Sequence, residues 1–351
     1  MNNAPMNPMV EVPVQPVDTA VIGPGRMGGL YARILDQSAL TRLVAVCGEG
    51  DVTARNVAMA LDVPFYTGAR YRDMLADHPQ IEAVVVATSE WAHAAPVGAC
   101  LESGKHVLVE KPMATSPSDA VRMVHEAGRT GVHLMVCHSL RFDPRFASMR
   151  QAVARGDIGE ILHTYSRRTS QPEAADRVLG RFPLAYWLLP HDIDLALWAS
   201  GSAVDRVRAY ARSGGSRRQD LIVVVLTFEC GALAVLENVW GSPTRSGRPQ
   251  NQLFTIRGTT GAVEVLPYET GIAVYRGSDV AYPDTSVAPD VHGQTEGMSR
   301  SLIRHFAGVV RDLWEPLITP GDGLAVVRVA SAVDESLKQG REITMSTMRD
   351  V

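Results

Sequence analysis

The stretch TAVIGPGRMGGLYARILDQ, residues 19–37, decides the fold of this 351-residue chain. An apolar run ends in Gly23, and Gly25 and Gly28 complete a G-x-G-x-x-G spacing before a segment with apolar residues at helical intervals. The first glycine allows a tight turn, the second lets a pyrophosphate approach the backbone, and the third lets helix and strand pack closely. Because a helix N-terminus attracts phosphate charge, the stretch predicts a dinucleotide-binding strand–loop–helix unit. The alternative is a glycine turn that binds nothing.

The same kind of pattern continues to about residue 140: apolar runs typical of strands alternate with segments that have helical spacing. The runs are LVAVCG (43–48), IEAVVVAT (81–88), HVLVE (106–110) and HLMVCHS (133–139). They are apolar on both faces, which is typical of a parallel sheet covered by helices.

After residue 140 the pattern changes to one amphipathic helix and many strand-like segments with short turns between them. We therefore expect an α/β Rossmann domain over 17–140 and an α+β domain with a large, mostly antiparallel open sheet over 141–351. Residues 1–16 are expected to form a loose arm, because they are rich in proline. A sheet with one free face often pairs with another subunit, so we expect a homodimer or homotetramer.

Composition excludes several classes of partner. The formal net charge is −4, whereas proteins that bind nucleic acid usually carry a basic surplus. No apolar run approaches the roughly 20 residues of a membrane span, and the N-terminus lacks the charged start of a signal peptide. The four cysteines are far apart and form no C-x-x-C pair, so neither a metal site nor a disulfide framework is indicated. We expect a cytoplasmic protein whose cysteines are buried thiols.

The residues around the glycine loop suggest which cofactor binds. Arg26 and Met27 fall within the glycine spacing and are placed beside the dinucleotide. Glu49 follows the second strand, where NAD-binding proteins usually carry an acidic residue for the ribose hydroxyls. No cation appears before Arg55 to receive a 2′-phosphate, so the pattern favours NAD over NADP. The alternative is that Glu49 is a solvated loop charge.

Three further residues follow the third strand. Thr88 and Ser89 lie at a carboxyl end of the sheet, where ligands bind in such folds, and His93 is placed beside the cofactor. The alternative for His93 is a residue at a helix start that hydrogen-bonds to backbone.

The fourth strand ends in two opposite charges, Glu110 and Lys111, followed by Pro112. A lysine held at this edge of the sheet can stabilise charge on a reacting oxygen, and a lowered pKa would let it join proton transfer. Glu110 either holds the cofactor or orients the lysine. The alternative is a surface ion pair before a turn.

A second cluster lies in AYWLLPHDIDLALWASG, residues 185–201. His191 is expected on a helix that begins or kinks at Pro190. Paired with Lys111 across a cleft, it is an acid–base group suited to neutral pH. A lone histidine in such an apolar segment is otherwise a satisfied core residue.

These residues together resemble the glucose–fructose oxidoreductase, inositol dehydrogenase and MocA (Gfo/Idh/MocA) oxidoreductase family. The resemblance covers almost the whole chain after residue 17. It rests on GPGRMG, EKP, RFDPR, GDIGEI, HDID, RGTTGAVEV and DGLAVVRVASAVDESLKQGREI, which occur in the family's order.

The resemblance implies NAD(P)-dependent hydride transfer at a secondary alcohol or ketone of a sugar, aminosugar, nucleotide sugar or cyclitol. Lys111 and His191 match the family's catalytic lysine and histidine. The positions of family substrate contacts correspond to Arg141 and to Tyr165 or Arg168. Two alternatives are a non-catalytic NAD(P)-binding regulator and a glycosidase that uses NAD for transient oxidation.

This chain departs from the family at one position. Inositol-dehydrogenase-like members carry an aspartate four residues before the histidine, and here that residue is Trp187. Either Asp192 or a substrate hydroxyl replaces this relay, or His191 acts with Lys111 alone. Trp187 either stacks on a sugar ring or is a core aromatic.

Overall fold

The computed structural model describes residues 15–50, 52–170, 184–213, 221–240, 250–266, 271–276 and 279–348. The predicted arm therefore lies outside the described residues except for its last two positions.

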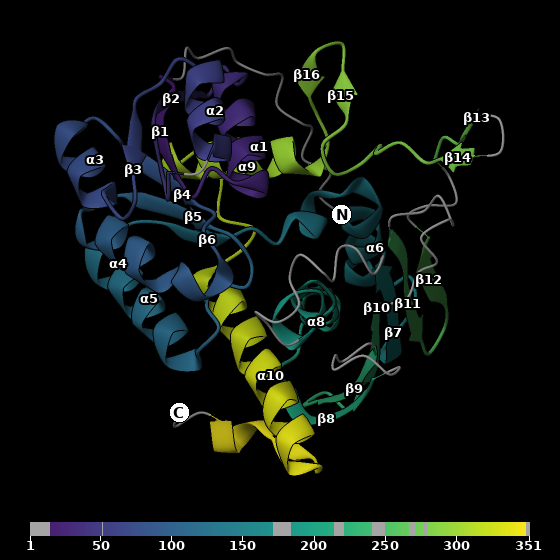
Figure 1. Ribbon diagram of the computed structural model, residues 1–351. Helices are drawn as coiled ribbons and strands as arrows, with labels where there is room; N and C mark the ends of the chain where they lie inside the picture. The colour runs from purple at the N-terminus through teal and green to yellow at the C-terminus, as the bar shows by residue number, and fades with distance from the viewer. Residues whose placement is uncertain are drawn as a thin grey trace.

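The first part of the chain forms a six-stranded parallel sheet with the strand order β3-β2-β1-β4-β5-β6 (Figure 1). Its strands are β1 (Val17–Ile22), β2 (Thr41–Gly48), β3 (Phe65–Thr67), β4 (Ala83–Val86), β5 (His106–Val109) and β6 (Leu134–Val136). The helices are α1 (Arg26–Asp36), α2 (Val52–Ala60), α3 (Tyr71–Asp77), α4 (Ala94–Glu102) and α5 (Pro117–Thr130). The order reverses between β1 and β4, and ligands of open α/β sheets bind at such a switch point.

The second part forms a seven-stranded sheet with the order β12-β11-β7-β10-β9-β8-β17. Its strands are β7 (Ile161–Ser170), β8 (Val204–Arg212), β9 (Leu221–Phe228), β10 (Leu233–Trp240), β11 (Gln250–Gly258), β12 (Ala262–Val265) and β17 (Ile343–Thr344). Only β7 and β10 pair in parallel, and the other pairs in this sheet are antiparallel. The predicted fold class is confirmed.

One face of this second sheet is covered by helices. Along β9, alternate residues from Ile222 to Phe228 are buried, although almost the whole strand is apolar. The buried set packs on α8 (Leu189–Ser200) and α10 (Pro320–Gln339), and α6 (Pro144–Ala154) covers the β12 side.

The chain then returns to the first unit. Helix α9 (Met298–Val310) contributes Leu302 and Phe306 to the hydrophobic core of the parallel sheet. Helix α10 runs between the two units (Figure 1), with Val327 in the first core and Val326 and Val329 in the second. The assignment of 141–351 to a second domain stays a prediction, but the packing shows that 298–327 helps to build the first unit.

Smaller elements complete the description. The hairpins are β13 (Val274–Arg276) with β14 (Asp279–Ala281) and β15 (Asp290–Val291) with β16 (Gln294–Thr295), and 3-10 helices span Glu90–Ala92, Ser139–Phe142, Leu184–Tyr186 and Met345–Met348. Within the described ranges, none of the helices combines the length and apolarity needed to cross a bilayer. Three cysteines are buried as expected, but Cys230 is exposed because it lies in the β9–β10 turn.

Candidate active site

The glycine loop between β1 and α1 has the geometry that its spacing predicts. Gly23 has φ +86°, and a Cβ there would lie 2.6 Å from the Thr88 nitrogen. A Cβ on Gly28 would lie 2.1 Å from the Gly23 carbonyl oxygen, so helix and loop touch here. A Cβ on Gly25 would meet nothing within 4 Å. The loop is therefore closed on its inner side and open at Gly25, as the approach of a pyrophosphate to α1 requires.

The ends of β2 and β4 form the walls beside this loop. A Cβ on Gly48 would lie 2.8 Å from Pro24 Cδ, so the last residue of β2 lies against the loop, and Glu49 follows as an exposed carboxylate. The contact of Gly23 with Thr88 brings the end of β4, with Ser89 next to it, to the other side. These residues fit a dinucleotide laid across the switch point, with Glu49 at the ribose hydroxyls.

His93 has a different place from the one expected beside the cofactor. Its ring is fully buried, with Nδ1 3.0 Å from the Pro112 carbonyl oxygen and Nε2 3.2 Å from the Thr88 carbonyl oxygen. Burial lowers the pKa of His93, while its contacts with the Pro112 and Thr88 carbonyl oxygens oppose that change. The histidine joins the β4 loop to the loop after β5, which corresponds to the alternative that it bonds to backbone.

Glu110 and Lys111 follow β5 at the same edge of the sheet. The Glu110 carboxylate accepts a hydrogen bond from the Tyr31 hydroxyl at 2.6 Å and one from the backbone N–H of Lys111 at 2.9 Å. The Lys111–Pro112 bond is cis. Glu110 is thus fixed between α1 and the lysine backbone, which favours the reading in which it orients Lys111.

The Lys111 side chain reaches the second unit. Its Nζ donates to the Trp187 carbonyl oxygen at 2.9 Å and lies 5.6 Å from the centroid of the Trp187 ring. Burial lowers the pKa of Lys111, with Glu110 opposing the change and Arg168 and Arg26 adding to it. Arg26, exposed at the start of α1, is therefore close enough to act on the lysine electrostatically.

His191 lies in the first turn of α8, close to this lysine. Its pKa falls well below the ordinary value of 6.5, first because of burial and then because Lys111, Arg168 and His138 each disfavour a second positive charge nearby. The positive end of the α8 dipole also disfavours an imidazolium there. Lys111 Nζ bonds the Trp187 carbonyl just before α8, so the lysine amine and a histidine with a lowered pKa lie at the same end of that helix.

Asp192, directly after His191, turns away from this pair. Its carboxylate is fully buried and accepts hydrogen bonds from Ser166 Oγ at 2.7 Å, Arg168 Nη2 at 3.0 Å and Asn238 Nδ2 at 2.8 Å. With both oxygens engaged by the sheet, Asp192 anchors α8 and does not take the relay position. Arg168 lies beside the site, because its guanidinium contacts Asp192, the residue after His191, and its charge lowers the pKa of Lys111 and of His191.

Tyr165 and Arg141 are not brought to the Lys111–His191 pair. Tyr165 and Arg168 are three residues apart on β7, so their side chains point to opposite faces of the sheet. Tyr165 lies on the open face, where its hydroxyl donates to Glu237 at 2.7 Å. Arg141 is buried and donates to Asp194 at 2.7 Å, to Asp322 at 3.1 Å and to the Leu317 carbonyl at 3.1 Å. We therefore exclude both from the proposed substrate contacts.

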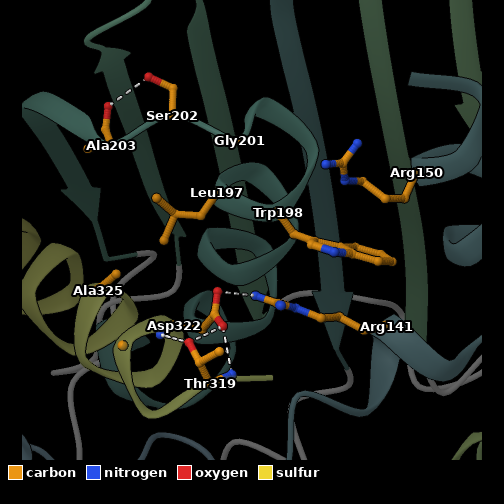
Figure 2. Close-up of a pocket in the computed structure, with 11 residues that line it drawn as sticks. Arg141, Arg150, Leu197, Trp198, Gly201, Ser202, Ala203, Thr319, Asp322 and Ala325 are labelled. Carbon is orange, nitrogen blue, oxygen red and sulfur yellow. Dashed lines mark hydrogen bonds and ion pairs between the residues drawn. The ribbon is translucent and has the colours of Figure 1, made fainter. Parts of the chain in front are cut away.

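Arg141 instead forms the floor of a separate cavity of about 400 Å³, shown in Figure 2. The cavity lies at the C-terminal end of α8, beside Trp198 and Gly201, and the start of α10 borders it. The residues that line this cavity include neither Lys111 nor His191, and those from α8 belong to the C-terminal half of the helix.

Sequence reasoning missed three residues near the site. His138 follows β6, is buried, and has no hydrogen-bond partner for either ring nitrogen among the described residues. Asn238 and Gln252 lie on the inner face of the second sheet. The sequence pattern that could have revealed Asn238 and Gln252 is a polar residue at a position that alternation assigns to the buried face. Asn238 follows Ala234 and Leu236 at intervals of two, and Gln252 precedes Phe254 and Ile256 in the same way.

Comparison with known proteins identifies the class. Residues 17–138 match the family model described as "Oxidoreductase family, NAD-binding Rossmann fold", and residues 146–264 match the GFO/IDH/MocA C-terminal domain. The chain belongs to the Gfo/Idh/MocA family of oxidoreductases and binds NAD, which confirms the resemblance and the predicted cofactor.

Three similar proteins illustrate the range of the family. The chain is 32% identical to myo-inositol 2-dehydrogenase of Thermotoga maritima, over 62% of this chain and 67% of the relative. It is 26% identical to 2,7-anhydro-N-acetylneuraminate hydratase of Escherichia coli K12, over 72% of this chain and 68% of the relative. The fold matches scyllo-inositol dehydrogenase of Lactobacillus casei, solved with NAD(H) and scyllo-inositol, at a TM-score of 0.80 and 18% identity, over 94% of this chain and 99% of that one.

Two glycine substitutions separate the folding role of the loop from its binding role. Gly25→Val places its side chain in open space, so we expect native stability but NADH binding weakened by roughly ten-fold or more, because the pyrophosphate loses its approach. Gly28→Ala brings a Cβ to 2.1 Å from a carbonyl oxygen, and we expect a loss of about 2 kcal/mol or more in the free energy of unfolding. Fluorescence titration with NADH and urea unfolding measure the two effects. Wild-type NADH affinity in Gly25→Val would contradict this assignment.

Proposed function

We propose that this chain is an NAD-dependent dehydrogenase that oxidises a secondary alcohol of a sugar or cyclitol, or reduces the corresponding ketone. The observation that carries the proposal is the Lys111 ammonium next to a neutral His191, at the edge of the sheet where the glycine loop opens. The inositol dehydrogenases among the relatives support the substrate class.

The two side chains divide the proton chemistry in this proposal. His191, held neutral, accepts the proton of the carbinol hydroxyl. One N–H of Lys111 donates to the Trp187 carbonyl. Its other N–H groups donate to the carbinol oxygen and stabilise the charge that develops there. NAD, when bound, takes up the hydride from the carbinol carbon. Holding the substrate, the lysine and the histidine in the reactive geometry can lower the activation free energy by about 7–11 kcal/mol.

Trp187, at the position of the family's relay aspartate, has a role in this arrangement. Its carbonyl oxygen and its ring both face the ammonium of Lys111. We propose that it aims the lysine, and that His191 works without a carboxylate relay. Arg168 completes the substrate wall from β7.

The open face of the second sheet supports self-association. On β9 the residues that alternate with the buried ones are Leu221, Val223 and Val225, and all three are only half-buried. A sheet face turned to water usually carries polar residues, so we propose that this face pairs with a second copy in a homodimer or homotetramer.

A charge on this face should separate the copies. We expect the wild-type chain to sediment as a dimer or tetramer and Val225→Glu to sediment as a monomer, because a carboxylate buried in an apolar interface is costly. Met59→Glu, on an exposed position of α2, is the control. A wild-type monomer at micromolar concentration would refute the pairing.

Removing the amine tests the catalytic assignment. We expect Lys111→Met to bind NADH normally yet lose roughly 100–1,000-fold in kcat, the cost of a lost donor to a developing oxyanion. The assay is the rise of NADH absorbance with a panel of inositols, hexoses and aminosugars. Lys105→Met, at the opposite end of β5, is the matched control. Turnover of Lys111→Met at the wild-type rate would disprove the role.

The same assay tests a second candidate function, the glycosidase that uses NAD for transient oxidation; a relative named as a hydratase, not a dehydrogenase, is the observation in its favour. An enzyme that oxidises its substrate only transiently converts it without accumulating NADH or ketone. Accumulation of both products identifies the dehydrogenase.

The pKa of His191 gives a pH test that needs no turnover. Because burial, Lys111 and Arg168 disfavour the imidazolium, we expect an NMR titration midpoint below 6.5, so that proton acceptance persists in mildly acidic solution. Lys111→Met removes one of the opposing cations, and the midpoint should rise. A wild-type midpoint at or above 6.5 would contradict the neutral histidine.

A further inference from the structure

The inner face of the second sheet changes from apolar to polar at one end. In the middle of the sheet the inward residues of β10 and β11 are apolar, such as Leu236 and Phe254. Two residues further along β10 and two residues earlier in β11, the inward residues are Asn238 and Gln252. Both are in register with Arg168 of β7, so the three polar side chains form one row across three neighbouring strands, the Asn238–Arg168–Gln252 row.

This row is buried and lies at the catalytic end of α8. The exposed fractions of its members are 0% for Asn238, 3% for Arg168 and 6% for Gln252. Asn238 and Arg168 both donate to Asp192, the residue after His191. The position of the row is thus tied to the helix turn that carries the histidine.

The hydrogen bonds within the row fix the orientation of both amides. Asn238 turns its Nδ2 to the Asp192 carboxylate at 2.8 Å, because only a donor can face those oxygens. Gln252 turns its Oε1 to Arg168 Nη1 at 3.2 Å, because only an acceptor can face a guanidinium. Asn238 Oδ1 and Gln252 Nε2 are left over, and neither has a partner among the described residues.

An unpartnered acceptor and an unpartnered donor on either side of a buried arginine indicate a ligand. Buried amides in folded proteins almost always have hydrogen-bond partners. Apolar side chains at these two positions would simply continue the hydrophobic core that Leu236 and Phe254 belong to, so the polar pair needs another explanation. Arg168 also keeps N–H groups beyond the three that the row and Asp192 engage. Hydroxyl groups, which both donate and accept, satisfy all of these atoms.

We propose that the Asn238–Arg168–Gln252 row is the specificity-determining wall of the site, and that it selects a polyhydroxylated ring by its hydroxyl pattern. Asn238 Oδ1 accepts from one hydroxyl, and Gln252 Nε2 donates to another. The inference rests on the proposed function and names two substrate contacts that the sequence did not suggest. Epimers and deoxy analogues that lack these hydroxyls leave the amides unpaired and are rejected.

Gln252→Glu is the sharpest test, because it retains an oxygen that faces Arg168, turns the free donor into an acceptor and adds a negative charge beside the arginine. The probes are myo-inositol, scyllo-inositol, hexoses and their monodeoxy analogues, titrated calorimetrically into the enzyme–NADH complex and assayed for turnover with NAD. We expect affinity and kcat/KM for the preferred ring to fall roughly ten-fold or more, while kcat and the KM for NAD change little. Gln151→Glu, an exposed position on α6, controls for the added charge.

Gln252→Met provides a second, uncharged test. In wild type, the analogue that lacks the contacted hydroxyl should bind much more weakly than the parent ring. In Gln252→Met this ratio should shrink toward one, because neither ring has a donor to meet. Thermal unfolding of each variant reports on its fold.

The outcomes separate this inference from the proposed function. If a ring binds but NAD is not reduced, the dehydrogenase proposal fails, and the binding ratios still decide the role of the row. If folded Gln252→Glu and Gln252→Met keep the wild-type epimer preference and deoxy ratio, the row does not set specificity, although dehydrogenation stands. If no polyhydroxylated ring binds the wild-type enzyme–NADH complex, the inference is overturned.

Discussion

The site depends on one half-buried amine, that of Lys111, which bridges two units of the chain. Lys111 comes from the end of a parallel strand, and its side chain donates a hydrogen bond to the carbonyl of Trp187 in the other unit. A lysine taken out of water needs such a partner. The contact places the turn before α8, and therefore His191, against the edge of the first sheet. The group that the chemistry needs is therefore also a contact between the two units, in addition to the packing of α10 on both cores.

Electrostatics then determine what each group can do. Lys111 and Arg168 both disfavour a positive charge on His191 and lower its pKa. Asp192, although adjacent in sequence, is taken up by Arg168, Ser166 and Asn238. The neutral imidazole and the oriented amine are therefore complementary: one accepts a proton, and the other stabilises negative charge.

Much of this could be predicted from sequence, because local patterns encode it. The glycine spacing requires a loop that only certain residues permit, and strand–helix alternation requires a parallel sheet. The partners of the arginines could not be predicted in this way. Whether Arg168 or Tyr165 faces the site depends on the pairing of β7 with distant strands, and Arg141 is neutralised by Asp194 and Asp322, which are far from it in sequence. The polar residues at inward positions of β10 and β11 were a signal that the alternation pattern already contained.

The return of α9 and α10 to the first core affects how the protein is made. Leu302, Phe306 and Val327 complete the hydrophobic core of a unit whose strands all lie before residue 140. During synthesis, that core stays unfinished until nearly the entire polypeptide has left the ribosome. The nucleotide-binding half therefore cannot mature as an independent first product of translation, and both halves reach their final packing together at the end of the message.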